Sequence, residues 1–347
     1  MTILLLCLAL LLSFFLLARI VDNFFVDALD HISNDLRLSS DAAGATLMAV
    51  GSSAPELFVA LFAVLKPGEH QGIGVGSIVG SALFNLLVIV GAAALVRRSK
   101  LTWQPIVRDI IFYFLAVGLL LWGLMDGEFN MMDAGIFIGL YVLYVVAVIY
   151  WRKILPYKDN GIKEEEDIDE TSWFDRFSRP ADKVLCKCFP SEKNYYWVFT
   201  ISIVVIAALS WVLVEAAVEL SAILNIPEAI VGLTVLAIGT SIPDLFSSLV
   251  VAKQGRADMA VSNAIGSNIF DILIGLGVPF MIYMIIHGGV IETSGGRLFE
   301  SSSILMGSII VLIVLLFSTK WIAGKRIGWI LILLYVAYLA NAIFNIY

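Results

Sequence analysis

The sequence contains the stretch GATLMAVGSSAPELF at Gly44 to Phe58, and a second version of it, GLTVLAIGTSIPDLF, at Gly232 to Phe246. Eight of the fifteen aligned positions are identical, and the second stretch begins 188 residues after the first. Each stretch carries one carboxylate, Glu56 or Asp244, inside an apolar segment. A carboxylate near the centre of a bilayer costs about 2.5–3.5 kcal/mol on insertion scales, so two equivalent acids of this kind indicate a function.

The similarity continues beyond these two stretches. GSALFN at Gly80 to Asn85 corresponds to GSNIFD at Gly266 to Asp271, at an offset of 186 residues. The connector between the two blocks therefore differs by only about two residues between the copies. The chain is an internal duplication.

The composition is that of a membrane protein. Hydrophobic residues make up 60% of the chain and charged residues 15%, and the mean hydropathy is +0.94, far from the values of soluble domains. An α-helix needs about 20 apolar residues to cross the hydrocarbon core. The sequence predicts an all-α integral membrane fold with ten such helices, at 2–29, 39–65, 72–97, 105–125, 131–155, 194–222, 227–252, 258–286, 302–319 and 326–346.

The charges predict the orientation. With the N-terminus outside, 20 of the 22 Lys and Arg residues fall on the inner side, which leaves only Lys66 and Arg297 outside. Both termini are therefore predicted to lie outside. The net charge of −7 comes from loops, and there is no basic surface of the kind that nucleic acid requires. The three cysteines form no disulfide framework.

One long polar segment, 152–193, divides five predicted spans from five. We therefore expect a first five-helix repeat at 1–151 with its motif at 44–91, a cytoplasmic linker, and a second repeat at 194–347 with its motif at 232–277. Because each repeat has an odd number of spans, the two must be inverted, as in secondary transporters with ion sites at the midplane. The acidic run at 164–170 lacks the glycine of an EF-hand loop, which favours a solvated linker over a calcium sensor.

The duplicated motif gathers oxygen atoms. Ser52 and Ser53 precede Glu56 by four and three residues and so share its helix face. Pro55 has no N–H, which leaves the carbonyl of Gly51 without its helical partner. Residues 239–244 repeat this arrangement. Carboxylate, hydroxyl and carbonyl oxygens are the ligands that hard cations such as Ca²⁺ prefer.

The third and eighth spans add further side-chain oxygens, on Ser81, Asn85, Ser267, Asn268 and Asp271. Lys and Arg are absent from the interiors of these four spans, so the acids need protons or metal ions. Small residues and serines in membrane helices often serve packing alone. That alternative can explain any single serine, but not the duplicated acids and prolines together.

Other polar residues carry weaker signals. Glu215 and Glu219 share a face near the outer end of the sixth span, where an interfacial or packed location is favoured over an ion vestibule. His31, His70 and His287 fall at loops or span ends and are expected to be surface residues.

At these motifs the chain resembles the cation/calcium exchanger (CaCA) superfamily, whose two inverted repeats carry a Gly-(Ser/Thr)-Ser-x-Pro-(Glu/Asp) signature. The forms GSSAPE, GTSIPD and GSNIFD look most like potassium-dependent sodium/calcium exchangers and their prokaryotic relatives. Proton/calcium exchangers usually show a Gly-Asn-x-x-Glu pattern instead.

The resemblance implies a ligand set. Glu56 and Asp244 would be central ligands shared by Ca²⁺ and Na⁺. The set would be completed by Ser52, Ser53, Thr240, Ser241 and the carbonyls of Ala49 and Ala237, and flanked by Ser81, Asn85, Ser267 and Asp271. Asp271 stands where the potassium-dependent branch has an acid, but some potassium-independent relatives also carry Asp there, so K⁺ use stays open.

We therefore expect an antiporter, not an enzyme, that expels Ca²⁺ in exchange for Na⁺, with spans 1 and 6 rocking against the others as the resemblance implies. It would be a multi-pass protein of the plasma membrane, the inner membrane if bacterial. Its partners would be the bilayer and the transported ions, without a cofactor, and a monomer is one option. A Ca²⁺/H⁺ antiporter using the same acids is the alternative. An intramembrane aspartyl protease built on Asp244 and Asp271 would lack its Gly-x-Gly-Asp motif and would not explain Glu56.

Overall fold

The computed structural model describes residues 2–36, 49–68, 70–155, 182, 185, 189–190, 194–253, 257–293 and 296–344. Over these residues the chain is helical, with two pairs of very short strands and three π-helical segments, labelled η. The elements are α1 (Thr2–Ile20), η1 (Val21–Phe25), α2 (Val26–Asp35), α4 (Ala49–Leu65), α5 (Gln71–Phe84), η3 (Asn85–Ile89), α6 (Val90–Val96), β1 (Ser99–Lys100), α7 (Trp103–Met125), β2 (Glu128–Phe129), α8 (Met131–Ile154), α10 (Tyr195–Leu224), α11 (Glu228–Val231), η5 (Gly232–Leu236), α12 (Ala237–Lys253), α13 (Ala257–His287), β3 (Ile291–Glu292), α14 (Gly296–Ser318), β4 (Ile322–Ala323) and α15 (Lys325–Phe344).

The helices have the length and surface of a membrane bundle. Within the described ranges, nine helical segments are long and apolar enough to span a membrane, and Gly51–Leu65 is a shorter apolar helix. Large apolar side chains such as Leu143, Val314 and Leu333 point outward and are about 60% exposed. So many exposed large apolar side chains on spanning helices indicate a surface that faces lipid rather than water. The prediction of an all-α, multi-pass membrane protein is confirmed, while the first part of the predicted span 39–65 lies outside the described residues.

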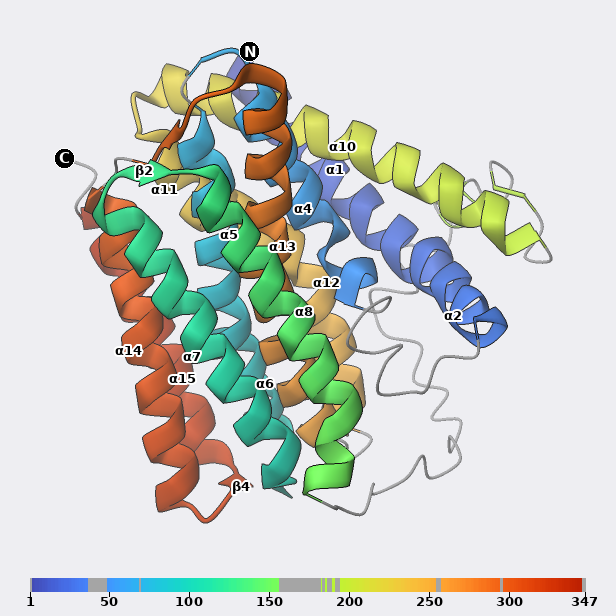
Figure 1. The fold of residues 1–347 in the computed structure, drawn as a ribbon, viewed down its shortest axis with the longest axis vertical. Coiled ribbons are helices and arrows are strands. Elements are labelled where there is room, and N and C mark those ends of the chain that lie inside the picture. Colours follow the sequence, from blue (N-terminus) through green and yellow to red (C-terminus); the bar gives the residue numbers. More distant parts are fainter. Residues whose placement is uncertain are drawn as a thin grey trace.

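The buried side chains form two main cores. The larger core lies among α5 to α8 and α13 to α15. The second lies between α1 and α10 and extends to α4 through Val59 and Ala63. Figure 1 shows α1 and α10 side by side, inclined to the upright helices of the main bundle. The second core therefore joins the two long helices to the bundle, through residues of α4, α5 and η5.

The short strands join the loops at both ends of the bundle. Strand β1 pairs with β4 and strand β2 with β3, and both pairs are antiparallel. Strand β1 precedes α7 and β2 follows it, so the two pairs lie at opposite ends of a spanning helix (Figure 1). Gln71, at the start of α5, donates to the carbonyl of Glu292 at 2.7 Å, which places the α4–α5 connection at the β2–β3 end.

The backbone of α5 approaches η5 very closely. A Cβ atom built on Gly80 would lie 2.3 Å from the carbonyl oxygen of Leu233, and one on Gly76 would lie 2.6 Å from that of Ala229 in the adjoining α11. On the facing segment, a Cβ on Gly232 would lie 2.5 Å from the carbonyl oxygen of Ile73. Small residues at four-residue spacing permit this contact in membrane helices. The two copies of the duplicated sequence thus meet backbone to backbone.

A buried ion pair ties α7, α8 and α13 together. The Nε of Arg108 donates to Asp109 at 2.8 Å, and both side chains are buried. Asp109 also accepts hydrogen bonds from the hydroxyls of Tyr144 at 3.2 Å and Ser262 at 2.7 Å. This acid is therefore satisfied by neighbours on three helices.

The glycine contact can be tested by adding a methyl group. We expect Gly80→Ala to destabilise the protein by about 1–3 kcal/mol, because overpacking forces α5 away from η5. Gly135→Ala, on α8 with open space around its Cβ position, is the matched control and should be neutral or up to about 1 kcal/mol stabilising. Thermal unfolding in detergent measures both, and equal effects of the two substitutions would contradict the close contact.

Candidate functional site

The duplicated motif folds into two matching helices. Helices α4 and α12 are each 17 residues long and carry a proline, Pro55 or Pro243, at the same position. The acid follows the proline directly in both. Glu56 is 2% exposed, whereas Asp244 is half-buried.

Polar side chains from the first copy contact those from the second. The side chain of Glu56 interacts with that of Thr240, and the side chain of Ser53 with that of Asp271. The hydroxyls of Ser81 and Ser241 lie 2.7 Å apart. Asn85 donates to Ser267 at 3.5 Å. The structure thus brings eight predicted ligands into four pairs that cross between the halves.

Several oxygen atoms in this region are buried and unpaired. One carboxylate oxygen of Glu56, one of Asp271 and the amide oxygen of Asn85 have no hydrogen-bond partner within the described part of the chain. All three residues are at most 2% exposed. Unpaired buried oxygens are destabilising and uncommon in proteins. A bound cation would provide the missing partner for these oxygens.

Asp109 provides a contrast within the same protein. It is as buried as Glu56, yet it faces an arginine and two hydroxyl groups. Neither Glu56 nor Asp271 takes part in an ion pair with a basic residue of the described ranges. The structural carboxylate Asp109 is thus neutralised by a basic residue, whereas, over the same ranges, Glu56 and Asp271 are not.

The other predicted ligands are less closely joined. Asp244 interacts electrostatically with Glu56 and with Asp22 of η1, and Ser52 is half-buried. Ala49 and Ala237 begin α4 and α12, and no contact tests the role of their carbonyls. Over the described ranges, no group of three or more His, Cys, Asp and Glu side chains is close enough to hold a metal. The predicted ligands that contact each other are mainly hydroxyl and amide groups, each close to a different acid. Within these ranges the acids themselves do not cluster, as expected because carboxylates repel each other.

Two of the three π-helical segments lie at the site. Segment η3 begins at Asn85, and η5 ends just before α12. The hydroxyl of Thr240 donates to the carbonyl of Leu236, the last residue of η5, at 3.1 Å. Such interruptions of the α-helical pattern are frequent at functional sites.

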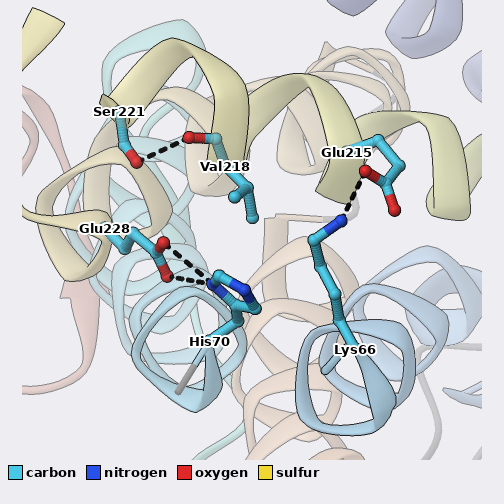
Figure 2. A network of polar contacts seen from close by, with 6 residues as sticks. All are labelled: Lys66, His70, Glu215, Val218, Ser221 and Glu228. Atoms are coloured by element: carbon cyan, nitrogen blue, oxygen red, sulfur yellow. Dashed lines mark hydrogen bonds and ion pairs between the residues drawn. The ribbon is translucent and has the colours of Figure 1, made fainter. Parts of the chain in front are cut away.

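A second polar group lies at the β2–β3 end (Figure 2). Lys66, just after α4, forms an ion pair with Glu215 of α10. Nδ1 of His70 lies 2.9 and 3.0 Å from the two carboxylate oxygens of Glu228 on α11, and Ser221 donates to the carbonyl of Val218. The side chain of Glu215 is 42% exposed and paired with Lys66, which agrees with an interfacial location. His70 is half-buried and paired, so its prediction as an ordinary surface residue was wrong.

Sequence reasoning missed two residues near the site. Asp109 directly follows Arg108 in an apolar run, and both side chains are buried. Tyr113 is fully buried, and its hydroxyl lies 3.0 Å from the amide nitrogen of Asn268. A tyrosine in an apolar helix gives no signal of such a contact, because packing and interfacial tyrosines look the same in sequence.

Comparison with known proteins agrees with this architecture. The family model of the sodium/calcium exchanger protein matches residues 6–150 and 194–344. Sodium/potassium/calcium exchanger 4 of Mus musculus is 27% identical, over 96% of this chain and 80% of the relative. Sodium/potassium/calcium exchanger 5 of Homo sapiens is 28% identical, over 93% of this chain and 79% of the relative.

Solved structures share the fold. The sodium-calcium exchanger NCX_Mj aligns with a TM-score of 0.60 at 23% identity, over 98% of this chain and 99% of that chain. The H⁺/Ca²⁺ exchanger CAX aligns with a TM-score of 0.70 at 16% identity, over 98% of this chain and 81% of that chain. The resemblance inferred from the motifs is confirmed. The chain therefore belongs to the sodium/calcium exchanger protein family, a family of membrane ion exchangers and not of enzymes.

Proposed function

We propose that the protein is an antiporter that exchanges Na⁺ for Ca²⁺ across the membrane. The observation that carries this proposal is the set of buried, unpaired oxygens on Glu56, Asn85 and Asp271. They come from α4, η3 and α13, so a cation bound between them would join both halves of the chain. Ser52, Ser53, Ser81, Thr240, Ser241, Asp244, Ser267 and the carbonyls of Ala49 and Ala237 complete the proposed ligand set.

The two halves, 1–151 and 194–347, are proposed to be inverted five-helix repeats joined by the linker 152–193. In each half, one short strand directly precedes the second-last helix, and a second strand lies between the last two helices. Exchanging the halves turns β1 into β3 and β4 into β2, so the pair β1–β4 becomes the pair β3–β2. Because these pairs lie at opposite ends of α7, a two-fold axis relating them would lie in the membrane plane. This supports inverted repeats.

The choice of Na⁺ as the coupling ion rests on the relatives. The proteins named sodium/potassium/calcium exchangers are the curated relatives that cover nearly the whole chain. The H⁺/Ca²⁺ exchanger CAX has a higher TM-score than NCX_Mj, and a carboxylate that binds a cation can equally carry a proton. Ca²⁺/H⁺ exchange is therefore the second candidate function. Co-transport of K⁺ through Asp271 is a separate property to test.

Alternating access would use the second core, which joins α1 and α10 to the bundle through apolar contacts. We propose that α1 and α10 move against the bundle that holds the ion site, in a plasma membrane with both termini outside. The β2–β3 end is then the outer end. There the ion pair between Lys66 and Glu215 joins α4 to α10, so it would hold the outer side closed. The protein needs no cofactor besides the transported ions and can act as a monomer.

Transport is the direct test. We expect ⁴⁵Ca²⁺ uptake into Na⁺-loaded proteoliposomes, lost in Glu56→Gln, because the amide removes the charge that balances the ion. Glu300→Gln, an acid on α14 that contacts Asn341, is the control and should transport normally. Uptake driven by a proton gradient without Na⁺ would contradict sodium coupling, and stimulation by external K⁺ would add that ion to the cycle.

The contrast between acids predicts opposite effects on stability. Asp109→Asn should lower the free energy of unfolding by about 3–5 kcal/mol, because it removes the carboxylate that faces buried Arg108. Asp271→Asn should leave the ion-free protein at least as stable as before, because it removes a buried carboxylate that no basic residue in the described part of the chain neutralises, and should abolish stabilisation by Ca²⁺. Thermal unfolding with and without Ca²⁺ measures both, and a large loss of stability in ion-free Asp271→Asn would identify that acid as structural.

The outer ion pair predicts a shift between conformations. Glu215 is 42% exposed, so the pair is worth at most about 1 kcal/mol, which corresponds to about a fivefold change in an equilibrium. In a background without native cysteines, Glu215→Gln should speed maleimide labelling of Val218→Cys from outside. The exchanged pair Lys66→Glu with Glu215→Lys should restore the slow rate. Glu219→Gln, one turn further along α10, is the control, and failure of the exchanged pair to restore slow labelling would argue against a lock.

A further inference from the structure

The side-chain amide of Asn85 can present either of two groups to an ion, and only its oxygen can bind a cation. The nitrogen of this amide donates to Oδ1 of Asn268 at 3.0 Å and to Oγ of Ser267 at 3.5 Å. The oxygen is the atom left unpaired. Asn85 is 1% exposed, so water does not hold it in this orientation.

The orientation is determined by a backbone group. The amide nitrogen of Asn268 lies 3.0 Å from the carbonyl oxygen of Ala82. A carbonyl only accepts hydrogen bonds, so Asn268 must turn its NH₂ group to Ala82 and its oxygen to Asn85. Asn85 must then turn its own NH₂ group to Asn268. A flip of either amide would set two oxygens, or two NH₂ groups, against each other.

Tyr113 of α7 closes this chain of hydrogen bonds. Its hydroxyl accepts from the amide nitrogen of Asn268 at 3.0 Å and donates to the carbonyl of Ala82 at 3.5 Å. Tyr113 and Asn268 are both fully buried. Both N–H bonds of Asn268 are therefore used, and its side chain has a single favourable orientation.

We propose that Asn268 and Tyr113 are positioning residues that keep the amide oxygen of Asn85 turned toward the transported cation. Neither residue touches the ion: Asn268 acts through Asn85, and Tyr113 acts through Asn268. The inference rests on the proposed function, because it takes Asn85 as a ligand. It adds α7, a helix outside the duplicated motifs, to the elements that determine cation affinity.

Equilibrium Ca²⁺ binding to the purified full chain is the readout. Asn268→Leu should raise the Kd for Ca²⁺ about tenfold, because Asn85 is free to turn its NH₂ group to the ion. Tyr113→Phe removes one hydrogen bond of two and should raise it by about fivefold or less. Tyr335→Phe is the matched control: this tyrosine is 4% exposed, and its hydroxyl has no partner among the residues the structure describes, so the Kd should not change.

A double-mutant cycle separates positioning from packing. In an Asn85→Ala background the oxygen to be oriented is absent, so Asn268→Leu and Tyr113→Phe should have no further effect on the Kd. A structural role would instead give the same fold-change in both backgrounds. Tyr113→Phe removes a single atom and keeps the test open if Asn268→Leu does not fold.

The outcomes are distinguishable. An additive cycle, or a Kd in Tyr113→Phe equal to that in Tyr335→Phe, overturns the inference and leaves the proposed exchanger intact. An unsubstituted protein that binds no Ca²⁺ overturns the proposed function itself. A cycle in which the Asn268 and Tyr113 effects vanish without the Asn85 side chain supports both.

Discussion

The contact between the backbones of α5 and η5 is the constraint on which the site depends. Glycines at 76, 80 and 232 let the two segments approach until a single added methyl group would overlap a carbonyl oxygen. Only at this separation can the short side chains of Ser81 and Ser241 meet at 2.7 Å. Serine and threonine have little reach, so a site built from them requires helices that are nearly touching. The glycines therefore determine where the oxygens lie, although they provide none of them.

Close packing excludes water from the site, and this exclusion is the reason why the unpaired oxygens would favour a bound ion. In a site open to solvent, the free oxygens of Glu56 and Asp271 would be hydrated and would have little preference for a bound ion. Buried, they have no solvent to replace a missing partner. A set of unpaired oxygens is thus less stable than a fully paired one, and under the proposed function a bound cation would recover that free energy. The paired acid Asp109 shows that the same bundle can neutralise a carboxylate where it serves the scaffold alone.

The duplicated motif made the acids, serines and asparagine of the site predictable, because a repeated pattern in an apolar chain has few explanations. The four pairs that cross between halves use residues taken from the sequence. The contacts that orient them were not predictable. Tyr113 and Asp109 acquire their roles from neighbours far away in the chain, and the orientation of Asn85 depends on a backbone carbonyl that has no sequence signature. His70 was predicted as a surface residue because it falls at a span end, and its partner Glu228 could not be identified from the sequence because it lies 158 residues away.

Two helix contacts differ in how strongly they resist displacement: that of α5 with η5, and that of α1 and α10 with α4. This difference bears on the proposed exchange cycle. The contact of α5 with η5 is fixed by backbone overlap, so small displacements there are strongly opposed. The contact of α1 and α10 with α4 is formed by apolar side chains such as Val59 and Ala63, and such contacts have little directional preference. A pair of helices held in this way can occupy two positions of similar free energy. The half-exposed pair of Lys66 and Glu215 is then strong enough to bias the choice between them and weak enough to be broken in each cycle. The ion site can thus stay rigid while access to it changes.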